Sequence, residues 1–133
     1  MQTNKTRTWI AGTLIACQVA LSGCAAAAVA LVAGSGAVAG YAVSRDKVEL
    51  LVERTFAETW DASLDEIRRL GILQETDEKE GEIEATVQGN KVTIQIKKES
   101  ETTLRLVIRA RRGLLPKVQV AQKVATRIAQ RLG

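Results

Sequence analysis

The sequence predicts an α+β fold, a two-layer sandwich in which two helices cover one face of a four-stranded, mostly antiparallel sheet. Four segments alternate apolar and polar residues, which is the two-residue period of a half-buried strand. Two other segments repeat apolar residues at spacings of three and four, as amphipathic helices do. Because the order is β-α-β-β-β-α and each strand has one apolar face, both helices are expected on the same side of the sheet.

The first strand and the first helix follow each other directly. Val48, Leu50 and Val52 alternate with other residues and predict the strand. Thr55 is expected to cap the helix, and Gly71 stands where a helix C-cap glycine is expected. The apolar face of this helix comprises Phe56, Trp60, Leu64, Ile67 and Leu70.

The remaining strands and the second helix show the same two patterns. An acidic stretch, 75–82, is expected to loop or bulge, and Gly89-Asn90 is a two-residue hairpin turn signal. Pro116 suits the first turn of the second helix. Ile72 and Leu73 are expected to re-enter the sheet after the helix. The strand residues expected to face the core are Ile83, Ala85, Val87, Val92, Ile94, Ile96, Leu104, Leu106, Ile108 and Ala110. The apolar face of the second helix comprises Val118, Ala121, Val124 or Ala125, Ile128 and Leu132.

Upstream of this domain, residues 21–24 have the sequence Leu-Ser-Gly-Cys, which is typical of a lipobox. Lys5 and Arg7 form a short positive region, and the apolar stretch that follows them has the length of a signal peptide. Small side chains give a peptidase access to the bond after Gly23, and the thiol of Cys24 would accept a diacylglyceryl group. The sequence therefore predicts cleavage after Gly23 and lipidation of Cys24.

A second match to the same pattern, Leu-Ile-Ala-Cys, ends at Cys17. It would leave an apolar region of only about eight residues, near the short limit for a signal peptide. We therefore favour Cys24, with Cys17 lost in the cleaved peptide. The alternative is that both cysteines are small apolar residues of an uncleaved membrane anchor.

The chain is expected to have three parts. Residues 1–23 are the lipoprotein signal peptide, 24–45 an Ala/Gly-rich tether or apolar helix, and 46–133 the periplasmic α+β domain. Gly36 and Gly40 have the small-xxx-small spacing that lets two helices approach closely in lipid. The middle part is thus either a flexible tether or a helix associated with the membrane.

Composition excludes several classes of function. Without Lys5 and Arg7, 17 basic residues face 15 acidic ones, a balance that argues against a nucleic-acid partner. The chain contains no His, one Phe, one Tyr and two Trp. It therefore lacks the most frequent general base and metal ligand, and it offers few aromatic rings on which bases could stack. We expect no cofactor.

The solvent-facing residues of the last strand form a candidate docking surface. Its members are Arg105, Arg109, Arg111 and Arg112. One interpretation is that such residues form cross-strand pairs with acidic residues of neighbouring strands. The other is a basic surface for anionic lipid headgroups, lipopolysaccharide phosphates or an acidic partner.

Two groups of acidic residues are candidates for chemistry. Asp61, Asp65 and Glu66 could in principle act as paired carboxylates, but their spacing alternates with the apolar stripe and fits a solvated helix face. The acidic residues Glu75, Asp77, Glu78, Glu80 and Glu82 do not have the spacing of an EF-hand loop, which places a turn glycine and a terminal bidentate glutamate at fixed positions. We predict no enzymatic activity and no metal site.

Several short pieces of the chain, taken together, carry a family resemblance. They are the Leu-Ser-Gly-Cys box followed by 25–28, the Gly/Ala-rich stretch to Tyr41, Ser63-Leu64-Asp65-Glu66, Leu70-Gly71, Gly81-Glu82-Ile83-Glu84-Ala85 and Lys91-Val92-Thr93-Ile94. This arrangement resembles the small bacterial lipoproteins grouped as domain of unknown function 3568, over nearly the whole chain. The resemblance implies a short exported lipoprotein with no assigned activity, and it adds no catalytic residue. The long basic helix at the end of this chain departs from the family pattern.

From the sequence we expect a lipid-anchored protein of the bacterial envelope. Ala25 rather than Asp follows Cys24, which favours sorting to the outer membrane, facing the periplasm. The expected partners are the membrane, through N-terminal acyl chains, and an envelope protein or a second copy of the chain. The domain would be a non-catalytic interaction or accessory module. The alternative is a lipid- or small-ligand-binding domain, which would need an apolar cavity between helices and sheet.

Overall fold

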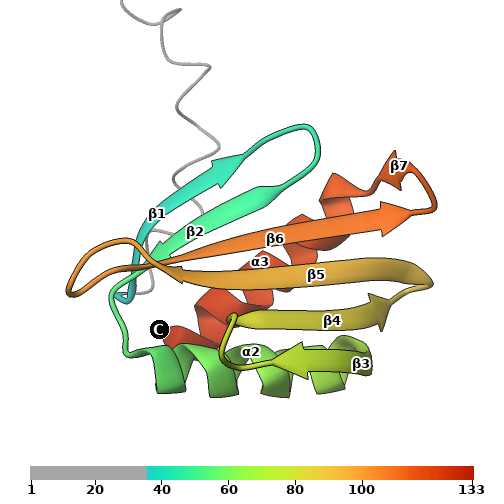
Figure 1. The fold of residues 1–133 in the computed structure, drawn as a ribbon. Helices are drawn as coiled ribbons and strands as arrows, with labels where there is room; N and C mark the ends of the chain where they lie inside the picture. The colour runs from blue at the N-terminus through green and yellow to red at the C-terminus, as the bar shows by residue number, and fades with distance from the viewer. Residues whose placement is uncertain (1–35) are drawn as a thin grey trace, which may run out of the picture. The chain divides into compact units, whose positions relative to one another are not determined.

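One open antiparallel sheet of seven strands is the centre of the computed structural model, which describes residues 36–133 (Figure 1). The strand order is β1-β2-β6-β5-β4-β3, and β7 pairs with β6 outside this path. The strands are β1 (Val38–Val43), β2 (Val48–Val52), β3 (Gly71–Asp77), β4 (Glu82–Val87), β5 (Asn90–Lys98), β6 (Leu104–Arg112) and β7 (Leu115–Pro116). The helices are α2 (Phe56–Leu70) and α3 (Val118–Leu132).

The α+β class and the two helices agree with the sequence, but the predicted four-stranded sheet is wrong. β1 adds a strand inside the stretch 24–45. The segment predicted as one strand with a loop or bulge at 75–82 is two strands, because this acidic stretch contains the end of β3, a tight turn and the start of β4. β7 adds a strand of two residues beside the end of β6.

β1 belongs to the folded domain through both packing and hydrogen bonding. Ala37, just before the strand, is 1% exposed, and its carbonyl accepts a hydrogen bond from the Glu53 N–H at 2.8 Å. Gly40 lies in the strand, where an added Cβ would be 3.2 Å from Cδ1 of Leu51. Gly36 and Gly40 therefore do not lie on a helix, and their spacing does not serve helix packing. Alternation could not reveal this strand, because a run of Ala, Gly and Val has no polar residues to set a two-residue period.

Both helices pack on one face of the sheet. α2 contacts β3 and β4, α3 contacts β1, β2 and β6, and the two helices contact each other. The fully buried side chains between the layers include Leu50, Ile67, Ile83, Ile94, Leu106, Ile108 and Ile128. Ile72 lies in β3, as predicted, but it is 68% exposed, because pairing with Thr86 places it on the outer face. Among the described residues, neither helix is long and apolar enough to cross a membrane.

The β4–β5 hairpin turns one residue earlier than predicted. Gln88 and Gly89 have φ angles of 52° and 73°, the pair of positive values that a type I′ turn requires. Asn90 is instead the first residue of β5. Its side-chain amide donates hydrogen bonds to the carbonyls of Val87 at 3.2 Å and Gln88 at 2.9 Å. The predicted inward residues keep their positions, because the register is set by the apolar alternation.

Thr55 caps the start of α2, as predicted, and the structure adds a capping box with Glu58. Glu58 N–H donates to Oγ1 of Thr55 at 3.3 Å, and Thr55 N–H donates to Oε2 of Glu58 at 3.1 Å. Thr55→Ala should lower the free energy of unfolding by about 1 kcal/mol. Thr55→Ser should lower it much less, because serine can also cap the helix. Urea unfolding of both variants checks this, and equal losses for Ala and Ser would contradict the capping role.

Candidate functional site

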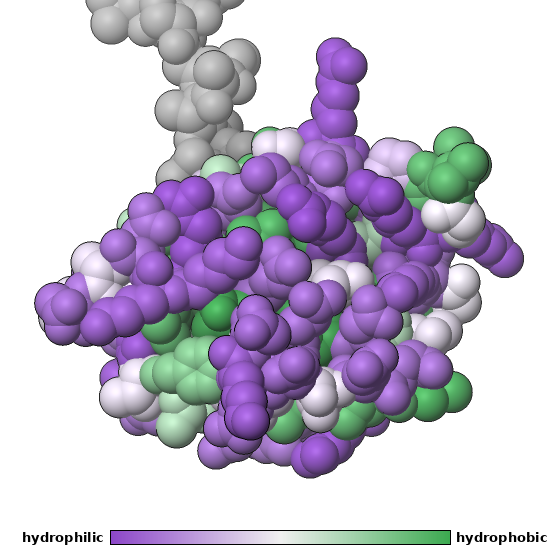
Figure 2. Space-filling view, in the orientation of Figure 1, coloured by the Kyte–Doolittle hydropathy of each residue, from purple (hydrophilic) through white to green (hydrophobic). Residues whose placement is uncertain are grey.

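The helices leave one side of the sheet uncovered, and we call this side the open face. It faces the viewer in Figure 1, and Figure 2 shows that mostly hydrophilic residues cover it. Along each central strand, buried residues alternate with the more exposed residues of this face, except that Val107 of β6 is buried on it. The open face is therefore a polar surface built from regular structure.

Charge divides the open face into two halves. The basic half lies on β5 and β6 and comprises Lys91, Lys97, Arg105, Arg109 and Arg111. The acidic half lies on β3 and β4 and comprises Glu75, Asp77, Glu82 and Glu84. Because β4 and β5 are neighbours, the two halves meet along the line between these strands.

Two shallow hollows lie on this face. A hollow of about 340 Å³ is lined by Glu82, Lys91, Thr93, Gln95, Arg109 and Arg111. A second, of about 190 Å³, is lined by Glu75, Asp77, Glu80, Glu82 and Glu84. Within the described part of the chain, no group of three or more acidic or cysteine side chains is placed to share a metal ion. The acidic half is thus a charged surface.

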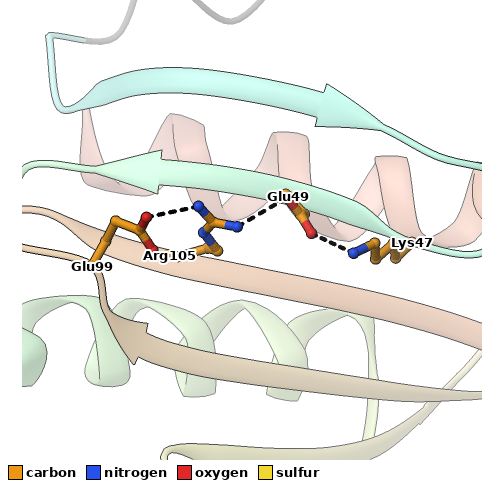
Figure 3. A network of polar contacts seen from close by, with 4 residues as sticks. All are labelled: Lys47, Glu49, Glu99 and Arg105. Carbon is orange, nitrogen blue, oxygen red and sulfur yellow. Dashed lines mark hydrogen bonds and ion pairs between the residues drawn. The ribbon is translucent and has the colours of Figure 1, made fainter.

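A chain of ion pairs crosses the β2 side of the open face (Figure 3). Nζ of Lys47 lies 2.6 Å from Oε1 of Glu49, whose Oε2 lies 3.7 Å from Nη1 of Arg105. Nη2 of Arg105 lies 2.8 Å from Oε1 of Glu99. Arg105 is therefore held between two carboxylates, and its charge is largely neutralised within the fold.

This network lowers the pKa of Glu49 below its ordinary value of 4.5. The hydrogen bond from Lys47 is the main cause, burial opposes it, and the charges of Lys47, Arg105 and Arg109 add to it. Because the pKa is lower in the folded state, Glu49 stabilises the fold above pH 4.5, and the contribution is lost as the pH falls through the folded value.

Glu49→Gln should therefore make stability less dependent on pH in the acidic range. Exposed ion pairs contribute about 0.2–1 kcal/mol, so the variant should lose roughly that much at pH 7 and little at pH 3. Urea unfolding midpoints of the variant and the unchanged chain at both pH values measure this. An equal difference at pH 7 and pH 3 would contradict the assigned role of Glu49.

The four arginines of the predicted docking surface occupy different environments. Arg105 is paired, as described above. Arg109 and Arg111 line the larger hollow, and neither has an ion-pair partner within 4.0 Å in residues 36–133. Arg112 is exposed and, by the two-residue period of β6, lies on the opposite side of the strand. The structure thus brings three of the four arginines together and separates Arg112 from them.

The predicted cross-strand pairs form at two places. Glu49 pairs with Arg105, and Glu84 pairs with Lys91, whose Nζ is 2.8 Å from Oε1 of Glu84. The hydrogen bond from Lys91 to Glu84 raises the pKa of this lysine above its ordinary value. The pair of Glu84 and Lys91 joins the two halves, and neither pair includes Arg109.

The carboxylates of α2 connect the two helices. Oδ2 of Asp65 lies 2.6 Å from Nη2 of Arg131 on α3. Oε1 of Glu66, which is 6% exposed, lies 4.0 Å from Nη1 of Arg131 and 3.8 Å from Nη1 of Arg69. Asp61 lines a surface hollow beside Asp65. Two of the three candidate carboxylates on this helix therefore have partners that explain them as structural residues.

The predicted lipidation site, Cys24, the cleavage position, Gly23, and the alternative, Cys17, lie outside the described residues. The sequence model of the family described as "Protein of unknown function (DUF3568)" matches residues 7–130. The chain belongs to this family. The DUF3568 match covers the predicted lipobox as well as every strand and most of α3, so the resemblance seen in the short motifs is confirmed. No curated protein matches the chain significantly.

Sequence patterns did not indicate two features of the DUF3568 domain. They predicted a loop or a bulge for the acidic stretch 75–82, whereas Glu75 and Asp77 lie in β3 and pair with Glu84 and Glu82 after an irregularity between Leu73 and Glu75. They gave no prediction for the β6–β7 turn, although Leu114 at its tip is 95% exposed. The pair Gly113-Leu114, between β6 and the two-residue strand β7, is a hairpin signal that could have indicated it.

Proposed function

We propose that this chain is the precursor of a bacterial lipoprotein, cleaved after Gly23 and acylated at Cys24. The positive start, the apolar stretch and the Leu-Ser-Gly-Cys box support the proposal. Several acyl chains would hold the mature protein on a membrane permanently, since two such signals are sufficient for stable attachment. Ala25 after the cysteine favours the outer membrane, with the domain in the periplasm.

The anchored domain is proposed to act by binding, without catalysis. The chain contains no His, and Asp65 and Glu66 hold Arg131 across the helix interface. A ligand carrier would need an enclosed apolar cavity. Hollows of about 340, 500 and 530 Å³ in residues 36–133 open on the surface and have mostly polar or charged linings. Small buried residues of α3 such as Ala121 and Ala125 bring this helix close to the sheet. A protein interaction is therefore favoured over the carrier alternative.

A second copy of the chain is the partner that fits the open face best. The observation that carries this proposal is the separation of its charges into a basic and an acidic half. A two-fold axis parallel to the strands, between β4 and β5, would place the basic half of each copy on the acidic half of the other. Two-fold interfaces use the same patch on both subunits, and stacked sheets commonly align their strands. Confinement to one membrane would raise the local concentration of the copies.

Charge exchange between two tagged copies tests this arrangement. Arg109→Glu with Arg111→Glu places two acidic residues in the basic half, and Glu82→Lys with Glu84→Lys places two basic residues in the acidic half. Neither variant should pair with itself, because like charges would face each other, whereas the two variants should pair when produced together. Membranes carrying both tagged copies are crosslinked, and recovery of one tag with the other is measured.

A matched control reverses two charges elsewhere. Lys123→Glu with Arg127→Glu changes the net charge as the arginine variant does, but on the exposed side of α3. It should pair with itself as the unchanged chain does. Absence of pairing in the unchanged chain, or undiminished self-pairing of both open-face variants, would contradict self-association through this face.

A further inference from the structure

The turn between β6 and β7 presents apolar side chains to solvent at one end of the sheet. Leu114 is 95% exposed and Leu115 is 66% exposed. Gly113 has a φ of +62° and, with Leu114, forms the two-residue loop between the paired Arg112 and Leu115. Figure 2 shows an apolar protrusion at the β7 end of a surface that is otherwise mostly hydrophilic. A tight turn thus holds two leucines outward, although burying them against the sheet would be favourable.

Basic residues surround the two leucines. Arg112 precedes the loop and Lys117 follows β7, and both are exposed. Arg45, in the β1–β2 turn, lines one surface hollow together with Pro116 and Lys117. None of these three cations takes part in an ion pair within residues 36–133. We call Arg45, Arg112, Leu114, Leu115 and Lys117 the hairpin tip.

We propose that the hairpin tip docks on an anionic phospholipid surface. The leucines enter the boundary between headgroups and acyl chains, and the cations contact the phosphates beside them. Apolar side chains flanked by Lys and Arg are the composition that membrane-surface segments use. Each cation near an anionic bilayer strengthens binding about fivefold. Salt weakens this electrostatic attraction, which reaches over about one Debye length. A partner protein would not require three unpaired cations around the apolar contact.

The tip lies at the opposite end of the sheet from the point where the chain enters it. Val38 pairs with Val52, which pairs with Leu104 at the start of β6, whereas the tip follows the end of this strand. The nine residues of β6 span about 30 Å. The twelve residue steps from Cys24 to Gly36 reach at most about 40 Å. If the proposed anchor holds, it and the tip can therefore contact the same bilayer.

Tryptophan fluorescence in the full-length chain tests the proposal. Leu114→Trp puts a reporter at the tip without disturbing the fold, because the leucine is almost fully exposed. Ile72→Trp is the matched control, since Ile72 is an exposed apolar residue at the other edge of the sheet. Each protein is mixed with phosphatidylethanolamine–phosphatidylglycerol vesicles that contain brominated phosphatidylcholine, which quenches only inserted indole rings. Emission is compared with that of the unchanged chain.

The proposal predicts a blue shift and a loss of emission for Leu114→Trp, and no change beyond the unchanged chain for Ile72→Trp. Adding Arg112→Gln and Lys117→Gln to Leu114→Trp should weaken the quenching about fivefold for each charge removed. Equal quenching at both reporter positions, or quenching that is as strong on phosphatidylcholine vesicles, would overturn the proposal. A blue shift that depends on protein concentration, without quenching, would assign the leucines to a contact between copies and would also overturn it. The two reporters probe the tip alone, so a negative result leaves the anchor at Cys24 and the pairing of open faces untouched.

Discussion

Gly71→Ala should lower the free energy of unfolding by about 3 kcal/mol or more, although it adds only one methyl group. A Cβ at this position would lie 2.1 Å from the carbonyl oxygen of Thr86 and 3.0 Å from Cα of Val87. Both atoms belong to the backbone of β4, so no side chain can turn aside. Urea unfolding of the full-length chain measures the loss.

Gly36→Ala is the control for this substitution. No atom lies within 4 Å of the Cβ that it would add, so its stability should stay within about 0.5 kcal/mol of the unchanged chain. Similar midpoints for the two variants would show that the close approach of Gly71 to β4 is not needed. That result would contradict the β3–β4 pairing at its first residue.

Cys24→Ala should release the protein from membranes. Each buried methylene of an acyl chain contributes about 0.8 kcal/mol, so loss of all the chains removes the whole attachment. Cys17→Ala is the matched control, because it changes the second lipobox-like cysteine and should leave the protein in the membrane fraction. Fractionation of cells that produce each variant measures both results. Persistence of Cys24→Ala in the membrane would favour an uncleaved apolar anchor, and release by Cys17→Ala would favour the earlier box.

Much of the fold follows from local patterns in the sequence. Alternation places the inward residues of β4, β5 and β6 correctly, because one face of each of these strands is buried and the other is solvated. Thr55 is recognisable as a cap because its box with Glu58 is a local contact. Gly71 is expected for its conformational freedom, yet its φ of −170° is open to any residue, and the contact with β4 requires the glycine. The position of Gly71 at the end of α2 could not predict this contact, because β4 comes from a later segment of the chain.

The candidate site is only half predictable for the same reason. The arginines of β6 are identifiable because they alternate with core residues. The acidic residues of β4 are identifiable in the same way, but those of β3 are not, because Gln74 is an extra residue in the β3–β4 pairing and shifts the alternation before Glu75. The partners of Arg105 and Arg131 come from other elements, so only the folded chain brings them together.

Mass spectrometry of the native protein, extracted from its membrane, tests the lipid anchor most directly. We expect a polypeptide that begins at Cys24, with a diacylglyceryl group on its sulfur and a mass that falls by these acyl chains after alkaline hydrolysis. A polypeptide that begins at Met1 and carries an unmodified thiol at Cys24 would contradict the proposed anchor.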